Sequence, residues 1–232
     1  MTARPEAHAD MEIAREARSI EVRRLGLVEY GAGLELQAAL VEQRRSAAIG
    51  DTLLLLEHPP VITLGVRTRG KPTNIIVSKD TLEREGVAVF ETGRGGDITY
   101  HGPGQLVGYP ILDLKPDRMD AHKYVRDLEE VLIGVCSDYG VAAGRKTGLT
   151  GVWVGEEKVA AIGVRLSRWV TSHGFALNVR TNLDHFGLIV PCGISDFGVT
   201  SLERLLGDAP PMGGVEDRAI HHLCRIFGRF PV

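Results

Sequence analysis

Cys192 is the cysteine of this chain whose position best suits a nucleophile. It stands between Pro191 and Gly193 at the end of the apolar run FGLIVPCGI. A proline and a glycine stop a strand and turn it, which can expose the sulfur, and a thiolate is both a strong nucleophile and a good leaving group. The alternative is that Cys192 is a buried small hydrophobe, as most lone cysteines are.

The other two cysteines do not indicate a disulfide or a metal site. Cys136 and Cys224 fall beside the apolar stripes of expected helices, so we predict that both pack in the core. Three widely spaced cysteines with no paired-ligand spacing do not indicate a disulfide framework or a zinc site, and they fit a reducing compartment. No metal and no cofactor is therefore expected.

Lys158 is the candidate partner for a nucleophilic cysteine. The chain has only six lysines beside its many arginines, and lysine is the cation that can lose its proton when it is buried. Lys158 follows the turn residues Glu156 and Glu157, so it could equally be a solvated hairpin charge. The small residues AAIG that come next favour a strand with room for a ligand, and the proposal requires Lys158 and Cys192 to meet in space.

Two further segments have compositions suited to a site. The stretch TGRGGDITYHGPGQLVGYP (92–110) is rich in glycine, which lets backbone N–H groups approach a ligand, although a plain mobile loop would look the same. It matches neither the phosphate-loop nor the dinucleotide pattern. HGFALN (173–178) again contains small residues, while His173 and the His58 of EHPP could each be structural.

Charge and hydropathy exclude several classes of function. The formal net charge of −3 gives no basic field for nucleic acid. We find no Gly-x-Ser-x-Gly elbow, no His-Glu-x-x-His helix and no apolar run of membrane-spanning length. We expect a cytoplasmic protein with a polar leader over residues 1–19.

The helices and strands that must position these residues can be predicted from the spacing of apolar residues and from the capping, glycine and proline residues that end each element. Expected helices cover 34–48, a short segment opened by the Asp80/Glu83 box, 121–139 with Asp120 as N-cap, a segment opened by Thr200 and Glu203, and a last helix carrying Ile220, Leu223, Phe227 and Phe230. Expected strands are 52–57, buried on both faces, then 87–91, 106–114, 151–154, 158–165 and 169–179. This order predicts an α+β fold with a mixed, mainly antiparallel sheet.

Five stretches in this order resemble the lipoyl(octanoyl) transferase family: LLLLEHPPVITLG, RGGDITYHGPGQLVGYPI, GVWV with KVAAIGVR, HGFALN and IVPCGIS. The resemblance implies a fold like that of lipoate and biotin protein ligases. It implies transfer of octanoyl from octanoyl-acyl carrier protein to a lysine of apo lipoyl domains, such as those of 2-oxoacid dehydrogenases and the glycine cleavage H protein. That reaction is the first step of endogenous protein lipoylation.

Family membership also implies roles for individual residues. Cys192 matches the acyl-thioester nucleophile and Lys158 the residue that activates it. The matching substrate-binding residues are Arg94, Gly95, Gly96, Asp97, Ile98, Thr99, Tyr100, His101, Ala161, Ile162, Gly163, Gly174, Phe175 and Ala176. Arg67, Arg69, Arg94 and Arg165 are candidates for receiving an acidic carrier protein.

Residues 20–232 are expected to form one catalytic domain with a smaller C-terminal subdomain, acting as a monomer. The alternatives are an ATP-dependent lipoate–protein ligase, a lipoyl amidotransferase and a non-catalytic module that binds an acylated carrier. The ligase needs no nucleophilic cysteine, and the binding module would gain no covalent octanoyl group.

Overall fold

The main sheet of the protein is mixed and mostly antiparallel, as the sequence predicts. The structure is a computed structural model that describes residues 18–68, 74–190 and 197–232. The strands of the main sheet lie in the order β12 (Phe230–Pro231), β1 (Ser19–Leu27), β2 (Asp51–Glu57), β6 (Gln105–Ile111), β10 (Val170–Asn178), β9 (Glu157–Ser167), β8 (Leu149–Val154) and β7 (Gly144–Lys146), and β11 (Gly198–Val199) pairs with β9.

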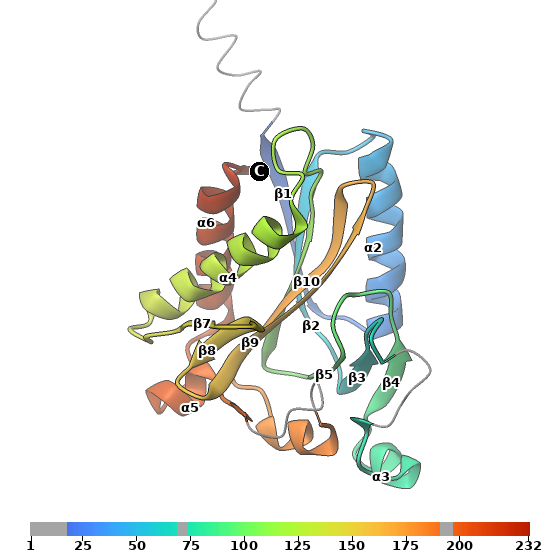
Figure 1. Ribbon diagram of the computed structural model, residues 1–232, viewed down its shortest axis with the longest axis vertical. Helices are drawn as coiled ribbons and strands as arrows, with labels where there is room; N and C mark the ends of the chain where they lie inside the picture. Colours follow the sequence, from blue (N-terminus) through green and yellow to red (C-terminus); the bar gives the residue numbers. More distant parts are fainter. Residues whose placement is uncertain (1–17, 69–73, 191–196) are drawn as a thin grey trace, which may run out of the picture.

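A second sheet of three strands lies beside the first. Its strands are β4 (Ala88–Glu91), β3 (Val61–Leu64) and β5 (Ile98–His101), with β3 in the middle. β3 runs parallel to β4 and antiparallel to β5. The helix α3 (Lys79–Arg84) and the 3₁₀ helix η2 (Leu183–Leu188) complete this part of the molecule (Figure 1).

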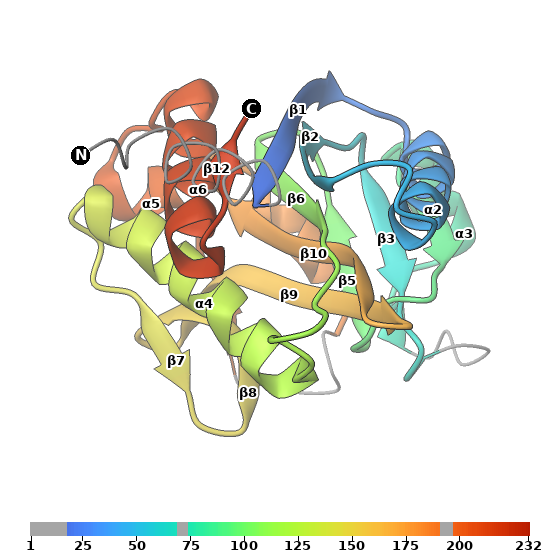
Figure 2. The same cartoon turned by 90° about the horizontal axis from the view of Figure 1, so that it is seen from above.

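Helices cover both faces of the main sheet. α4 (Ala121–Asp138) and α6 (Met212–Phe227) lie side by side on one face, and α2 (Tyr30–Arg45) lies on the other (Figures 1 and 2). The central strand β2 therefore has two buried faces, with Leu53 and Leu55 in the core under α4 and α6, and Leu54 and Leu56 in the core under α2. The prediction of a strand buried on both faces is confirmed.

Local capping explains the helix boundaries, and several differ from those expected. Asp120 accepts a hydrogen bond from the Lys123 N–H and begins α4 as predicted. The caps of α3 and α5 (Leu202–Leu206) are instead Ser78 and Ser201, whose hydroxyls reach the N–H groups three residues on. α2 begins four residues before the expected start, at Tyr30.

The last helix ends before Phe230, contrary to the predicted stripe. Gly228 takes a left-handed conformation with φ of 62° and stops α6 at Phe227. Phe230 consequently enters β12, where it is exposed. Within the described ranges, no helix combines the length and apolar character that crossing a bilayer requires.

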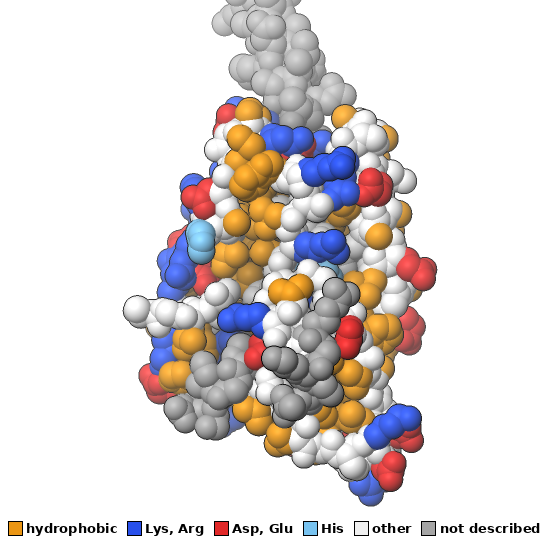
Figure 3. Space-filling view, turned by 45° about the vertical axis from the view of Figure 1, so that its right-hand side comes forward, with side chains coloured by type: hydrophobic (Ala, Val, Ile, Leu, Met, Phe, Trp, Pro, Cys, Tyr) orange, Lys and Arg blue, Asp and Glu red, His pale blue; other side chains and the backbone are white. Residues whose placement is uncertain are grey.

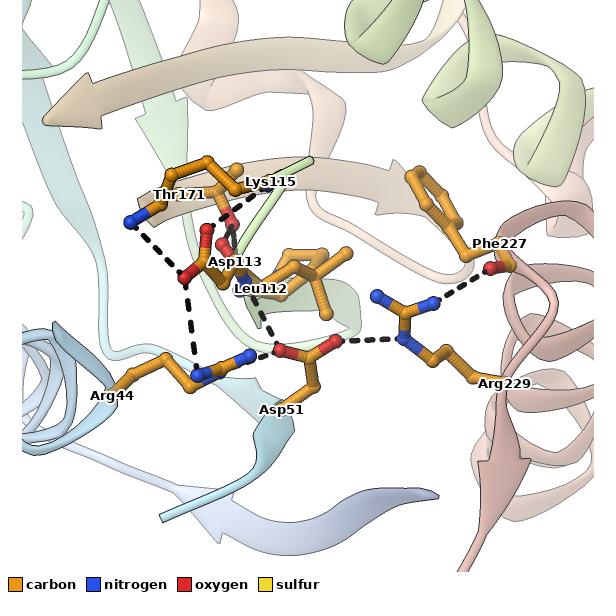
Figure 4. Close-up of polar contacts among 9 residues, drawn as sticks. Arg44, Asp51, Leu112, Asp113, Lys115, Thr171, Phe227 and Arg229 are labelled. Atoms are coloured by element: carbon orange, nitrogen blue, oxygen red, sulfur yellow. Dashed lines mark hydrogen bonds and ion pairs between the residues drawn. The ribbon is translucent and has the colours of Figure 1, made fainter. Parts of the chain in front are cut away.

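A buried carboxylate joins three distant parts of the fold. Asp51, at the start of β2, accepts hydrogen bonds from Arg44 Nε at 2.8 Å, Arg229 Nε at 2.7 Å and the Asp113 N–H at 3.0 Å (Figure 4). Its side chain is only 4% exposed. The contacts tie α2, the end of β6 and the C-terminal strand together, so loss of this carboxylate leaves two arginines without their shared partner.

We predict that Asp51→Ala lowers the free energy of unfolding by about 3 kcal/mol, because removing one member of a buried ion pair leaves its partners desolvated and uncompensated. Urea unfolding followed by circular dichroism measures this. Glu21→Ala, which breaks the exposed pair with Arg23, is the matched control and should cost less than about 1 kcal/mol. Equal losses in the two variants would contradict the assignment.

Candidate active site

The described residues enclose a cavity of about 460 Å³ against the face of the main sheet opposite α4. Its walls come from β8, β9 and β10, the glycine-rich segment before β5, the N-terminus of α2, η2 and β11. The lining residues include Tyr30, Arg67, Arg94, Gly96, Asp97, Ile98, Thr99, His101, Gln105, Trp153, Lys158, Ala161, Ile162, Gly163, His173, Gly174, Phe175, Ala176, Asn178, Phe197 and Val199.

Almost all of the residues predicted to bind substrate meet at this cavity. Gly95 and Tyr100 are the two that do not line it. The Tyr100 side chain packs instead in the core of the small sheet, and its hydroxyl lies 2.7 Å from His185 Nδ1. Lys158 lines the cavity, while Cys192 lies outside the described residues, so its contact with Lys158 remains a prediction.

A bulge in β9 decides which way Lys158 faces. Val152 pairs with Ala160 and the next residue, Trp153, pairs with Lys158, so one step on β8 spans two on β9. Val159, the extra residue between them, and Ala160 both enter the core under α4. In a regular strand Lys158 would share the face of Ala160, whereas the bulge moves Lys158 to the cavity face.

Gly151 and Trp153 restrict the conformation of the Lys158 side chain. Gly151 lies beside it with φ of +123°, and a β-carbon there would come within 3.3 Å of Lys158 Cε. The Gly151 N–H donates to the buried Glu129 on α4 at 3.1 Å, which holds that backbone in place. The Lys158 ammonium lies 4.7 Å from the centre of the Trp153 ring.

The glycine-rich segment is held by hydrogen bonds on two sides and is not a plain loop. The N–H groups of Gly65, Val66 and Arg67 donate to the carbonyls of residues 97, 94 and 96 at 2.9 to 3.2 Å. On the other side the Gly95 N–H donates to the Val164 carbonyl of β9 at 2.8 Å. The segment thus forms a wall that is fixed to both the small and the main sheet.

Close backbone packing explains two of the cavity glycines. A β-carbon at Gly163 would lie 3.0 Å from the Gly95 carbonyl oxygen, and one at Gly174 would lie 2.2 Å from the Gly108 carbonyl oxygen. These glycines therefore permit chain contacts rather than leaving empty volume. The small side chains that open the cavity are Ala161 and Ala176, which are direct cross-strand partners.

Arg94 is buried in the wall. Its guanidinium donates to the Thr63 hydroxyl from Nε at 3.1 Å and to the Thr63 carbonyl from Nη2 at 2.6 Å. Because the side chain is only 6% exposed, it belongs to the cavity interior rather than to a protein-docking surface.

A chain of buried amides connects His101 to the strand that carries Lys158. Gln105 Nε2 donates to Asn178 Oδ1 at 2.9 Å, which leaves Gln105 Oε1 to accept from His101 Nδ1 at 2.7 Å. Asn178 in turn donates to the Thr200 carbonyl, and the Thr200 N–H donates to the Lys158 carbonyl. This assignment places the lone pair of His101 on Nε2.

Burial keeps the imidazoles of this region neutral. It lowers the pKa of His101 to about 3, with the nearby His58 adding to the effect, and it lowers the pKa of His173 to about 4, with Arg94 adding to the effect. His58 is fully buried away from the cavity, its ring nitrogens bonded to the Val28 carbonyl and the Tyr109 hydroxyl. The structural interpretation of His58 is thus supported, whereas His173 lines the cavity.

Several lining residues escaped the sequence analysis as site candidates. Tyr30 is a single aromatic at a helix start, and no local pattern distinguishes it from a packing residue. Gln105 lies in the motif HGPGQ, Trp153 in GVWV and Asn178 in HGFALN. Their place in these motifs was the sequence signal that could have identified them as site residues. Phe197 stands outside every motif used.

Comparison with known proteins identifies relatives across most of the chain. Residues 29–224 match the family described as lipoyl protein ligase A/B catalytic domain. An octanoyltransferase of Myxococcus xanthus is 55% identical over 215 residues, covering 90% of this chain, which spans 60% of that relative's length. An octanoyltransferase of Solibacter usitatus is 54% identical, covering 90% of this chain and 94% of the relative.

Solved structures with low sequence identity share the fold. Lipoate-protein ligase A bound with ATP superposes with a TM-score of 0.73 at 15% identity, covering 92% of this chain and 89% of that one. Biotin protein ligase from Aquifex aeolicus gives 0.51 at 13% identity, covering 91% and 69%. The expected likeness to both ligase folds is confirmed.

We predict that the free energy of unfolding falls as the pH drops from about 6.5 towards 4. In that range unfolded histidine, with its ordinary pKa near 6.5, takes up a proton that buried His101 and His173 do not, and each such proton contributes about 1.4 kcal/mol per pH unit. Above pH 6.5 the contribution of these two histidines to the free energy of unfolding no longer changes with pH.

Chemical denaturation at several pH values tests this. His173→Gln should show a shallower pH dependence than the parent chain, whereas the same change at the exposed His122 should leave the dependence as it is. Identical pH dependences for the parent and His173→Gln would show that the buried ring does not contribute.

Proposed function

The chain belongs to the octanoyltransferases of the lipoyl protein ligase A/B catalytic domain family, and from this premise we propose that it moves octanoyl through a thioester on Cys192. The donor in this proposal is octanoyl-acyl carrier protein and the acceptor is a lysine of an apo lipoyl domain, such as that of a 2-oxoacid dehydrogenase or the glycine cleavage H protein. The observation that carries the proposal is the bulge that directs Lys158 into the cavity.

The chain on both sides of Cys192 supports its proposed place near Lys158. Before it, Ile189 bridges to Ile75, and the Val190 N–H donates to the Asn74 carbonyl. After it, Phe197 lines the cavity and Val199 pairs with Lys158 in β11. Both ends of the segment are thus anchored close to the cavity, which favours a meeting of sulfur and amine.

The first half of the proposed reaction loads the enzyme. The Cys192 thiolate attacks the thioester carbonyl of the donor, the carbon–sulfur bond to the carrier breaks, and the departing thiolate takes a proton from the Lys158 ammonium. Exchange of one thioester for another is nearly balanced in free energy. Backbone N–H groups close to the glycine-rich segment stabilise the oxyanion of the tetrahedral intermediate.

The second half releases the product. The amine of the acceptor lysine attacks the Cys192 thioester, neutral Lys158 removes a proton from the attacking nitrogen, and the amide forms as the Cys192 thiolate leaves. The pair returns to its starting protonation without any cofactor. An amide is more stable than a thioester, so this step drives the transfer.

The alanines of the paired strands suit an acyl chain. Ala161 and Ala176 face the cavity from β9 and β10, and burying about six methylenes at ~0.8 kcal/mol each contributes about 5 kcal/mol to binding. This apolar contribution is large enough to select chain length without polar recognition of the tail.

Exposed arginines are the proposed contact for an acidic carrier. Arg67 and Arg165 are exposed, Arg94 is excluded by its burial, and Arg69 lies outside the described residues. Basic side chains run down the middle of one face of the molecule, with most acidic ones towards its edges (Figure 3). The proposed enzyme acts in the cytoplasm as a monomer.

We predict that incubation with octanoyl-acyl carrier protein, without ATP, adds one octanoyl group to the chain, detected by intact mass spectrometry. Cys192→Ser should give no thioester that transfers to an apo lipoyl domain. Lys158→Met should load at least about 100-fold more slowly, as expected for loss of a proton-transferring group.

Lys79→Met is the matched control, because Lys79 is an exposed residue of α3. Full loading of Lys158→Met would overturn the role of Lys158. A requirement for ATP would indicate a ligase, and binding without a mass gain would indicate a carrier-binding module.

We also predict that Ala161→Leu shifts donor preference towards shorter chains, because the larger side chain occupies cavity volume. Each methylene that no longer fits costs about 0.8 kcal/mol, or about fourfold in relative kcat/KM. Competition between hexanoyl and octanoyl donors measures the shift, and Ala88→Leu on exposed β4 is the control. An unchanged preference would place the acyl chain elsewhere.

A further inference from the structure

The ring of Trp153 contacts Lys158 directly across the β8–β9 hairpin. The two residues are register partners, and the Lys158 ammonium lies 4.7 Å from the ring centre. An ammonium within about 6 Å of an aromatic face is attracted by the negative potential of that face, most strongly for tryptophan and when water is excluded. Trp153 is only 6% exposed and Lys158 is partly buried, so the contact lies largely inside the molecule.

Trp153 packs outside the apolar cores that most buried apolar side chains share. Among the described residues it belongs to none of the three apolar core clusters, and its indole N–H has no hydrogen-bond acceptor there. Its neighbours are Phe197, at 5.4 Å between ring centres and 72° between planes, and the ammonium groups of Lys158 and Lys146. Its orientation is therefore set by a ring and two cations.

Phe197 and Lys146 also contact the Trp153 ring. The Lys146 ammonium lies 4.0 Å from the centre of the Phe197 ring and is paired with Glu156. Phe197 begins the described chain after Cys192 and leads into β11. The indole thus contacts both the proposed proton donor and the first described residue after Cys192.

We propose that Trp153 is a positioning residue, whose indole face holds the Lys158 ammonium at the point where it delivers a proton to the departing carrier thiol. This inference rests on the proposed function, because it assigns Trp153 a role through Lys158. The ring contributes no atom to the reaction. Its electron density restricts where the ammonium can lie, which raises the fraction of complexes ready to react.

Fluorination of the ring provides a test that barely changes its size. Fluorine withdraws electron density from the indole face and weakens its attraction for a cation, while the ring still fills its place. The chain has two tryptophans, Trp153 and Trp169. In a Trp169→Phe chain, incorporation of mono-, di- and trifluorotryptophan therefore labels only Trp153.

We expect the rate of thioester formation from octanoyl-acyl carrier protein to fall stepwise with each fluorine, by about tenfold from none to three. This loss corresponds to about 1.4 kcal/mol and lies within the range of desolvated cation–π contacts. The Km for the donor should change little, because the ring acts on the ammonium rather than on the acyl chain. A Trp153→Phe chain, labelled only at Trp169, is the matched control and should show no dependence on fluorine number.

Substitutions complete the test. Trp153→Phe keeps an aromatic face and should retain more activity than Trp153→Leu, which keeps an apolar side chain only. A rate independent of fluorine number overturns the role of Trp153, whether or not the Leu variant folds. If Lys158→Met itself loads at the rate of the parent chain, the proposed function fails instead, so the two failures are distinguishable.

Discussion

The bulge in β9, in which Val159 is the extra residue beside Ala160, is the constraint on which the site depends. Both side chains enter the core under α4, and this burial of two consecutive residues turns the face of β9 over at Lys158. A charged side chain can then lie in a cavity while the same strand contributes to a continuous apolar core. The packing energy of two buried residues thus maintains the direction of one functional amine.

Close backbone contacts hold the rest of the cavity wall in place. The glycine-rich segment is joined to residues 65–67 and to β9 by hydrogen bonds, and Gly163 permits the approach on the β9 side. Glycine elsewhere often brings mobility, but here the absence of a side chain allows a tighter contact. The cavity is consequently a fixed shape with two alanines at its opening in the sheet.

Electrostatics divide the interior into two kinds of polar group. His101 and His173 are neutral because they are buried, and His101 Nδ1 is bonded in the chain that runs through Gln105 to Asn178. Charged side chains form the second kind, among them Arg94 and Lys158, which contact Thr63 and the face of Trp153 respectively. The interaction between two charges is stronger where they are removed from water, as the buried Arg94 is.

The sequence by itself determined the fold class, most elements and the family, because periodicity, caps and five ordered motifs are local properties of the chain. Nearly all of the residues that the family motifs marked for substrate binding line the cavity, but other lining residues, such as Tyr30, Trp153 and Phe197, were missed. Only the tertiary structure decided that Lys158 faces the cavity, that Arg94 is buried and that Gly163 and Gly174 serve backbone contacts. Those outcomes depend on strand register and on which segments meet, and a bulge changes the register without leaving a pattern in the neighbouring residues.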